Sequence, residues 1–317
     1  MCAIIEKIQK EVPIMSTNEN KGKKAEVTAL QAISAEDRKD WISLAFVQAG
    51  ICVCVPAFLL GALLAEAMPI WPAIISGSLG YLIVVVGMVA TGMIGCDLGL
   101  ASCTCCQAGF GKSGARFIVS TIFAVNMIGW FGIQNGVCGE AFSNAMLAMT
   151  GWDIPVVVSN TIWGIIMLLT AVYGVHALEK LDKISIPLLM IIMCYGTFLA
   201  FKVYGTGNLN DEGTVQSMSF MSGVALSFNF TAVGTITGPD YTRFQKSRKD
   251  TVKSVFYGVF PMGVITLIMG IVLTKLSGQY DISMVLIEVG LPLLGIIALV
   301  ISTWTTNSTN AYSAGLN

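Results

Sequence analysis

The chain has 317 residues, of which 55% are hydrophobic and 12% are charged, and its formal net charge is −1. A soluble domain carries about 25% charged residues, so about half of the expected charge is missing. This composition excludes a soluble globular domain, a fibre and a disordered chain. The near-zero net charge gives no reason to expect a nucleic acid as a partner.

Long segments without any charged residue account for the missing charge. They cover residues 41–65, 67–96, 117–139, 154–178, 184–201, 213–239, 254–274 and 289–317. A helix that spans a bilayer needs about 20 mostly apolar residues. The sequence therefore predicts an all-α integral membrane protein with about eight transmembrane helices. We expect a transmembrane domain over 41–317, preceded by a tail over 1–40.

The basic residues predict the orientation of these spans. Of the 18 Lys and Arg residues, all except Lys202 and Lys275 fall in the tail or in the loops after the second, fourth and sixth spans. The positive-inside rule places those loops in the cytoplasm. Because the tail has no apolar signal-peptide core, we expect it to be solvated, uncleaved and cytoplasmic. The protein is then a multi-pass protein of the cytoplasmic membrane.

The first span contains a weak point near mid-membrane, where the run Gln48–Cys52 includes Gly50 and is followed by Pro56. Exposed backbone is not tolerated in hydrocarbon, so such residues normally line a cavity. The loop after the second span holds Cys103, Cys105 and Cys106. Closed zinc sites usually need four ligands, and no histidine is near, so we interpret these cysteines as apolar filler in a packed loop or re-entrant segment.

The third span places Trp130 and Gln134 four residues apart, and therefore on one face of a helix. Asn126, one turn earlier, is predicted to join them. A tryptophan beside amide groups suits a flat heterocycle with polar edges, since stacking a base on an aromatic ring contributes about 1–3 kcal/mol. For Trp130 alone, an aromatic residue buried between helices is the simpler interpretation.

The sixth span is interrupted like the first. Polar residues in Ser227–Thr231 lead to Gly234, and Gly238-Pro239 is predicted to close the helix. Interruptions at equivalent positions of two repeats are a sequence indicator of a transporter's substrate site. Phe230, within this break, would cover the second face of a bound ring. The alternative is that both interruptions are helix-packing faces rich in small residues.

The stretch 302–310 of the eighth span is rich in hydroxyl and amide side chains. Ser302, Thr305 and Thr306 share one helical face because they are spaced i, i+3, i+4. Such oxygens, opposite the free carbonyls of a broken helix, would form a Na⁺ site. The alternative is that each hydroxyl bonds to its own helix. Glu66, Asp97 and Glu140 are not central in any span, so a proton relay is not the first choice.

Several motifs together resemble the nucleobase–cation symporter family of cytosine, purine, uracil, allantoin, hydantoin and thiamine permeases, and the cytosine permease branch most of all. The motifs are Gly129-Trp130-Phe131-Gly132, the run Gly234 to Phe244, Trp304-Thr305-Thr306-Asn307 with Asn310 to Leu316, and Gly99-Leu100 to Phe110-Gly111. The resemblance implies a five-plus-five inverted repeat within a twelve-helix fold, with discontinuous first and sixth helices. This chain would end within or just after the eighth helix, so we expect it to be a fragment.

The resemblance also implies roles for single residues. Trp130 would stack on the base and Gln134 would bond to its edge, with Asn229, Phe230, Asn310 and Cys52 at further substrate-facing positions. Ser302, Thr305 and Thr306, with the carbonyls of Gln48 and Ile51, would hold Na⁺. Departures from the family pattern at Met127, Gln107 and Cys52 affect which base is bound.

The sequence therefore predicts a monomeric secondary transporter, not an enzyme, that imports cytosine or a related nucleobase by symport. The coupling ion would be Na⁺, with H⁺ as the alternative, and no other cofactor is expected. Two rival functions remain at this point. One is a symporter of the same fold for an amino acid or another small heterocycle. The other is a membrane-embedded enzyme that uses Cys103–Cys106 with Asp97.

Overall fold

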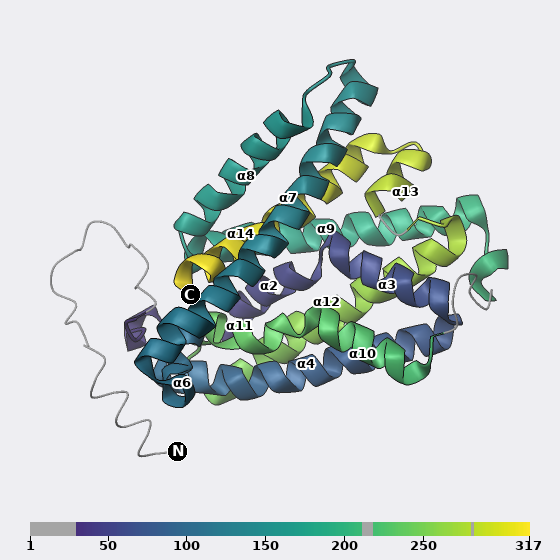
Figure 1. Ribbon diagram of the computed structural model, residues 1–317. Helices are drawn as coiled ribbons and strands as arrows, with labels where there is room; N and C mark the ends of the chain where they lie inside the picture. The colour runs from purple at the N-terminus through teal and green to yellow at the C-terminus, as the bar shows by residue number, and fades with distance from the viewer. Residues whose placement is uncertain (1–29, 211–217, 280–281) are drawn as a thin grey trace.

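The structure is a computed structural model that describes residues 30–210, 218–279 and 282–317 (Figure 1). Over these residues the backbone forms helices and no strand. The longer helices are α2 (Trp41–Cys52), α3 (Val55–Ala67), α4 (Ile70–Leu98), α6 (Gln107–Gly114), α7 (Ser120–Thr150), α8 (Val156–Val172), α9 (Val175–Tyr204), α10 (Phe220–Thr231), α11 (Val233–Thr242), α12 (Arg248–Ser277) and α14 (Pro292–Leu316). Shorter helices are α5 (Ser102–Cys105) and α13 (Ile282–Glu288).

Most of the helices overlap the charge-free segments of the sequence, but α9 also includes the charged stretch 179–183. In the described part of the chain, five helices are long and apolar enough to cross a membrane, and up to six if the bent pair α2 and α3 counts as one span. α8 has 17 residues and is shorter than these spans. The chain is therefore all-α and multi-pass, as the sequence predicts.

The first span is broken where the sequence predicts a weak point. α2 and α3 meet at an angle of 54°, and the connecting residues Val53 and Cys54 leave the helical conformation. Pro56 lies at the start of α3, where proline is tolerated because the first N–H groups of a helix have no partner within the helix. Because of the bend, no further helical turn supplies N–H groups to the last carbonyl groups of α2.

The sixth span is interrupted only slightly: α10 and α11 are separated at Ala232, whose dihedral angles stay helical, and together they form one span over Phe220–Thr242. Contrary to the sequence prediction, Gly238-Pro239 does not close this helix, because α11 continues to Thr242. Pro239 cannot donate to the carbonyl of Thr235, four residues earlier. The hydroxyl of Thr91 on α4 donates to that carbonyl instead, over 2.6 Å. A neighbouring helix thus satisfies the group that proline leaves free, which is how membrane helices tolerate proline.

The first and sixth spans each pack against one of the long continuous helices. α10 and α11 lie along α4, and α2 and α3 lie along α12. Small residues allow these backbones to approach closely. A Cβ on Gly80 of α4 would lie 2.5 Å from the Cβ of Ser227, and one on Gly270 of α12 would lie 2.4 Å from the carbonyl oxygen of Phe58. We call α2, α3, α4, α10, α11 and α12 the broken-helix group.

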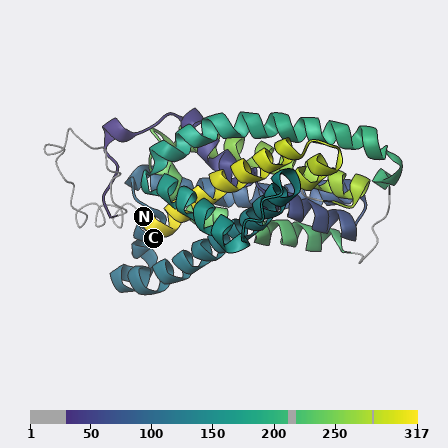
Figure 2. The same ribbon diagram turned by 90° about the horizontal axis from the view of Figure 1, so that it is seen from above.

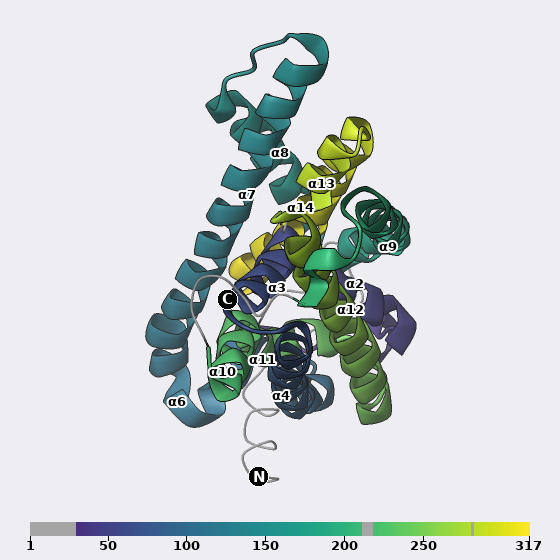
Figure 3. The ribbon, with the colours of Figure 1, turned by 90° about the vertical axis from the view of Figure 1, so that its right-hand side faces the viewer.

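A second group of helices covers one side of the first. α14 packs against α7, α8 and α9, and it also touches α2 (Figure 3). Figure 2 shows the long teal-green α9 along one side of the molecule, and this helix contacts both α2 and α12. The interior between the groups is where α2, α7, α11 and α14 come together.

Charged and polar residues connect the helix ends near the start of the described chain. The guanidinium of Arg38 donates to the carbonyls of Cys96 and Gln245 over 2.9 Å and 2.7 Å. Lys39 forms an ion pair with Glu179 on α9. The end of the predicted tail therefore docks against the helices, while residues 1–29 lie outside the described part.

Candidate functional site

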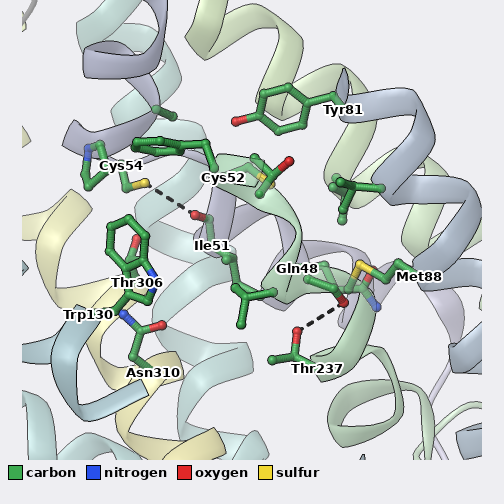
Figure 4. Close-up of a pocket in the computed structure, with 18 of the residues that line it drawn as sticks. Gln48, Ile51, Cys52, Cys54, Tyr81, Met88, Trp130, Thr237, Thr306 and Asn310 are labelled. Carbon is green, nitrogen blue, oxygen red and sulfur yellow. Dashed lines mark hydrogen bonds between the residues drawn. The ribbon is translucent and has the colours of Figure 1, made fainter. Parts of the chain in front are cut away.

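A cavity of about 100 Å³ lies between the break in the first span and the junction of α10 and α11 (Figure 4). About 10–15 Å³ on this measure suffices for one water molecule, so a small organic molecule fits after modest movement of side chains. The lining residues are Gln48, Ile51, Cys52, Cys54, Pro56, Ala57, Tyr81, Val84, Met88, Met127, Trp130, Gln134, Phe230, Thr231, Val233, Gly234, Thr237, Tyr241, Val259, Thr306 and Asn310. None of these described residues carries a formal charge.

Most residues that the sequence singles out meet at this cavity. From the first span come Gln48, Ile51 and Cys52; from α7, Trp130 and Gln134; from α10, Phe230; and from α14, Thr306 and Asn310. Ser302 and Thr305 are buried in α14 next to the cavity but do not line it. Segments that are far apart in the sequence thus supply one site.

The two aromatic rings of the site touch each other. The ring centres of Trp130 and Phe230 are 5.7 Å apart, with 68° between their planes, so the contact is edge to face. A ring sandwiched between two parallel aromatic rings needs them about 7 Å apart. A base therefore stacks between these side chains only after Phe230 moves away from Trp130.

Two predicted residues do not reach the cavity. Asn126 and Asn229 have exposed side chains and are not among the lining residues. Successive helical residues are about 100° apart, so Asn229 cannot share the direction of Phe230. On α7 the residue seven positions before Gln134 is Met127, and a seven-residue spacing returns almost to the same face. Met127 accordingly lines the cavity in place of Asn126.

The hydroxyl cluster of α14 combines both interpretations that the sequence leaves open. Ser302 donates to the carbonyl of Leu299 over 3.0 Å, and Thr305 donates to that of Ser302 over 2.9 Å. These two hydroxyls bond within their own helix. Thr306 differs, because its hydroxyl also reaches the carbonyl of Gly50 on α2, over 2.8 Å.

The end of α2 presents carbonyl oxygens to these side chains. Gly50 accepts from Thr306, and the carbonyl of Ile51 accepts from the thiol of Cys54 over 3.4 Å. The last carbonyls of a helix carry a partial negative charge that favours a cation. Carbonyl and hydroxyl oxygens are the ligands that hard cations such as Na⁺ take. The break in α2 is therefore suited to a small cation.

The sequence interpretation assigned a role only to the carbonyl of Gln48, and it missed both the side-chain amide of Gln48 and the carboxylate of Asp182. The side-chain amide of Gln48 lines the cavity and has no hydrogen-bond partner among the described residues. Asp182 is completely buried on α9, although the sequence suggested that the charged stretch before residue 184 is a loop. The signal was present: Leu178, Asp182, Ser185 and Leu189 have helical spacing and share the buried face.

The cysteine loop is a packed structural element. Asp240 of α11 accepts a hydrogen bond from the backbone N–H of Ser102 over 2.8 Å, which fixes the start of α5. Burial raises the pKa of Cys103 to about 11 and that of Cys105 to about 12, so neither is a thiolate at neutral pH. In residues 30–210, 218–279 and 282–317, no three His, Cys, Asp or Glu side chains are placed to hold a metal ion.

Comparison with known proteins places this architecture in a family. Residues 33–317 match the family model described as "Permease for cytosine/purines, uracil, thiamine, allantoin". The chain is 29% identical over 283 residues to the cytosine permease of Escherichia coli strain K12, covering 88% of this chain and 65% of that protein. It is 25% identical to the purine-uracil permease NCS1 of Arabidopsis thaliana, covering 84% of this chain and 49% of that protein. The chain thus spans about two thirds or less of these relatives.

The fold agrees with a solved transporter structure. The nucleobase-cation-symport-1 family transporter Mhp1, in a closed conformation with bromovinylhydantoin bound, superposes with a TM-score of 0.82 at 17% identity. The alignment covers 92% of this chain and 68% of Mhp1. An inward-facing structure of Mhp1 gives a TM-score of 0.73. The chain therefore belongs to the family of permeases for cytosine, purines, uracil, thiamine and allantoin, which are transporters and not enzymes.

Proposed function

We propose that this protein imports cytosine or a closely related nucleobase together with Na⁺, by alternating access. The observation that carries the proposal is the uncharged cavity between the break in the first span and the α10–α11 junction, which combines an aromatic ring, amide groups and a cation-suited helix end. A neutral, flat heterocycle with polar edges matches this lining. An amino acid carries two charges and would leave its carboxylate without a cationic partner among the described lining residues.

Recognition of the base would rest on stacking and on amide groups. Trp130 offers a ring face, and the buried amides of Gln134 and Asn310 lie on adjacent helices of the same cavity. Each amide both donates and accepts hydrogen bonds, as does the edge of a pyrimidine base. The unpartnered amide of Gln48 would supply a third such group. Cys52, which also lines the cavity, would lie between the base and the cation.

The cation would lie between α2 and α14. Thr306 already contacts the carbonyl of Gly50, and Ile51 supplies the next carbonyl. The carbonyl of Gln48 and the hydroxyls of Ser302 and Thr305 complete the predicted set, the two hydroxyls by turning away from their own helix. Because α2 and α14 belong to different helix groups, a bound cation would hold the groups together, which is how ion binding couples to alternating access.

Uptake of radiolabelled cytosine, with and without Na⁺, tests the proposal in cells that express the protein. We expect uptake to rise with Na⁺ and to be inhibited by excess unlabelled nucleobase but not by amino acids. Trp130→Ala should weaken base binding by about fivefold to 150-fold, since it removes about 1–3 kcal/mol of stacking. Trp163→Ala is the matched control, because that ring packs against Phe142 and Trp304 outside the cavity.

Uptake that responds neither to Na⁺ nor to Trp130→Ala would contradict the mechanism. If amino acids compete and nucleobases do not, the substrate class is wrong while the fold assignment stands. If a proton gradient drives uptake at constant Na⁺, the coupling ion is H⁺.

A further inference from the structure

Asp182 is a fully buried carboxylate that the proposed mechanism has not yet used. It lies on α9, its exposed fraction is 0%, and neither carboxylate oxygen has a hydrogen-bond partner among the described residues. A buried ionised carboxylate is costly unless a cation or donors compensate its charge. Acids inside membrane helices are therefore functional candidates by default.

The position of Asp182 relates it to the cation site. Its Oδ1 atom lies 2.6 Å from the point where a Cβ on Gly50 would be, so the carboxylate lies directly against the backbone of Gly50. The carbonyl of the same glycine accepts the hydroxyl of Thr306. Asp182 and Thr306, from α9 and α14, thus both touch the residue at the end of α2. Only glycine leaves room for this approach.

The nearby lysines are engaged elsewhere. Glu179, one turn earlier on α9, forms ion pairs with Lys39 and with Lys183, the latter over 2.7 Å. Lys183 also donates to the hydroxyl of Ser43 over 3.1 Å. These contacts hold both ammonium groups at Glu179, so they do not compensate Asp182. A cation or a proton at the carboxylate would neutralise it.

We propose that Asp182 is the anionic member of the cation site at the end of α2 and that it sets the affinity for Na⁺. The other members, which are carbonyls and hydroxyls, are neutral, so a single carboxylate neutralises the ion and makes it bind more tightly in this buried region. The inference rests on the proposed Na⁺ coupling. It adds a third helix, α9, to the two that form the site.

Binding of ²²Na⁺ to the purified protein, without any nucleobase, tests this role. Asp182→Asn keeps the size of the side chain and removes its charge, and we expect Na⁺ to bind at least about tenfold more weakly. Asp182→Glu, which keeps the charge, should recover part of the affinity. Glu140→Gln is the matched control because this acid is exposed on α7 outside the cavity, and Na⁺ affinity should stay unchanged.

Two further readouts separate an electrostatic role from a structural one. Cytosine binding at saturating Na⁺ and the melting temperature should stay close to wild type in Asp182→Asn. Wild-type Na⁺ affinity in Asp182→Asn would overturn the inference, and so would an equal loss in Asp182→Glu. If wild-type protein binds Na⁺ but no nucleobase, the substrate proposal fails while the role of Asp182 stands.

Discussion

Thr306 is one of the residues that join the two helix groups. Its hydroxyl contacts a carbonyl in its own helix, Ser302, over 3.0 Å, and one in α2, Gly50, over 2.8 Å. The hydroxyl is thus not bonded to its own helix alone, and its oxygen has lone pairs that can coordinate a cation. Neighbouring Thr309 bonds to Thr305 of its own helix, over 2.9 Å. The two threonines are therefore a natural pair for comparison.

We predict that Thr306→Ala weakens Na⁺ dependence more than it weakens base recognition. The concentration of Na⁺ that gives half-maximal uptake should rise several-fold, since a hydrogen bond or ligand contact contributes about 1 kcal/mol. Cytosine affinity at saturating Na⁺ should change little. Thr309→Ala should alter neither quantity, and equal losses of Na⁺ and cytosine affinity in Thr306→Ala would argue against this division of roles.

Thr91 illustrates how one side chain preserves a helix that contains proline. Because its hydroxyl donates to the carbonyl that Pro239 leaves free, Thr91→Val should cost about 1–3 kcal/mol of stability. In a Pro239→Ala background the helix can satisfy that carbonyl itself, so the same change should cost less. Melting temperatures of the four variants in detergent measure this coupling. A penalty of equal size in both backgrounds would contradict the assignment.

At the scale of helices, close backbone contact decides where the broken span lies. α3 and α12 cross with Gly61 and Gly270 at the contact, where added Cβ atoms would lie 2.5 Å and 2.4 Å from backbone oxygens. Helix association in membranes depends on such packing because lipid gives no hydrophobic driving force between helices. The angle between α2 and α3, and thus the cavity, depends on this crossing.

Gly270→Ala should lower the melting temperature of the protein, because overpacking typically costs about 1–3 kcal/mol. Gly129→Ala on α7 is the matched control: an added Cβ there meets nothing within 4 Å among the described residues. Alanine favours a helix over glycine by up to about 1 kcal/mol, so this control should be neutral or stabilising. A Gly270 variant as stable as the control would show that the crossing can relax.

At the scale of the whole molecule, ion pairs join the helix ends on the side where the basic loops gather. Arg248 at the start of α12 binds Asp97 at the end of α4 through contacts of 2.5–3.0 Å. Lys39 and Lys183 meet at Glu179. We infer that this side faces the cytoplasm, in the cell membrane, as the positive-inside rule predicts.

A fluorescent protein fused to the N-terminus should therefore fluoresce, and alkaline phosphatase inserted at Gly205, after α9, should be active. Each reporter works on one side of the membrane only, so the pair fixes the orientation. Phosphatase inserted after Ser113, near the end of α6 and before α7, is the control and should be inactive. The reverse pattern of activities would invert the proposed direction of import.

The sequence indicated where the helices of this fold lie more reliably than which face of each helix points toward the cavity. Spacing and polarity alone indicated the break in the first span, and they also indicated Trp130, Gln134 and Thr306, which line the cavity. Asn229 was assigned to the site although a rotation of about 100° separates it from Phe230. Asp182 was missed because charged neighbours suggested a loop, whereas α9 begins before them at Val175. The direction in which each side chain of a helix points depends on how that helix packs against its neighbours. The spacing of residues within one segment does not show this.

The sequence by itself determined the membrane class, the position of the spans and the residue types available for binding. These properties depend on each segment alone, because a helix that crosses the membrane needs a long apolar run and pairs its own backbone groups. Only the tertiary structure decided which groups meet. Gly50 and Thr306 are 256 residues apart, and Asp182 lies against the same glycine from a third helix. Their convergence depends on how α2, α9 and α14 pack, and only that packing brings these polar groups together.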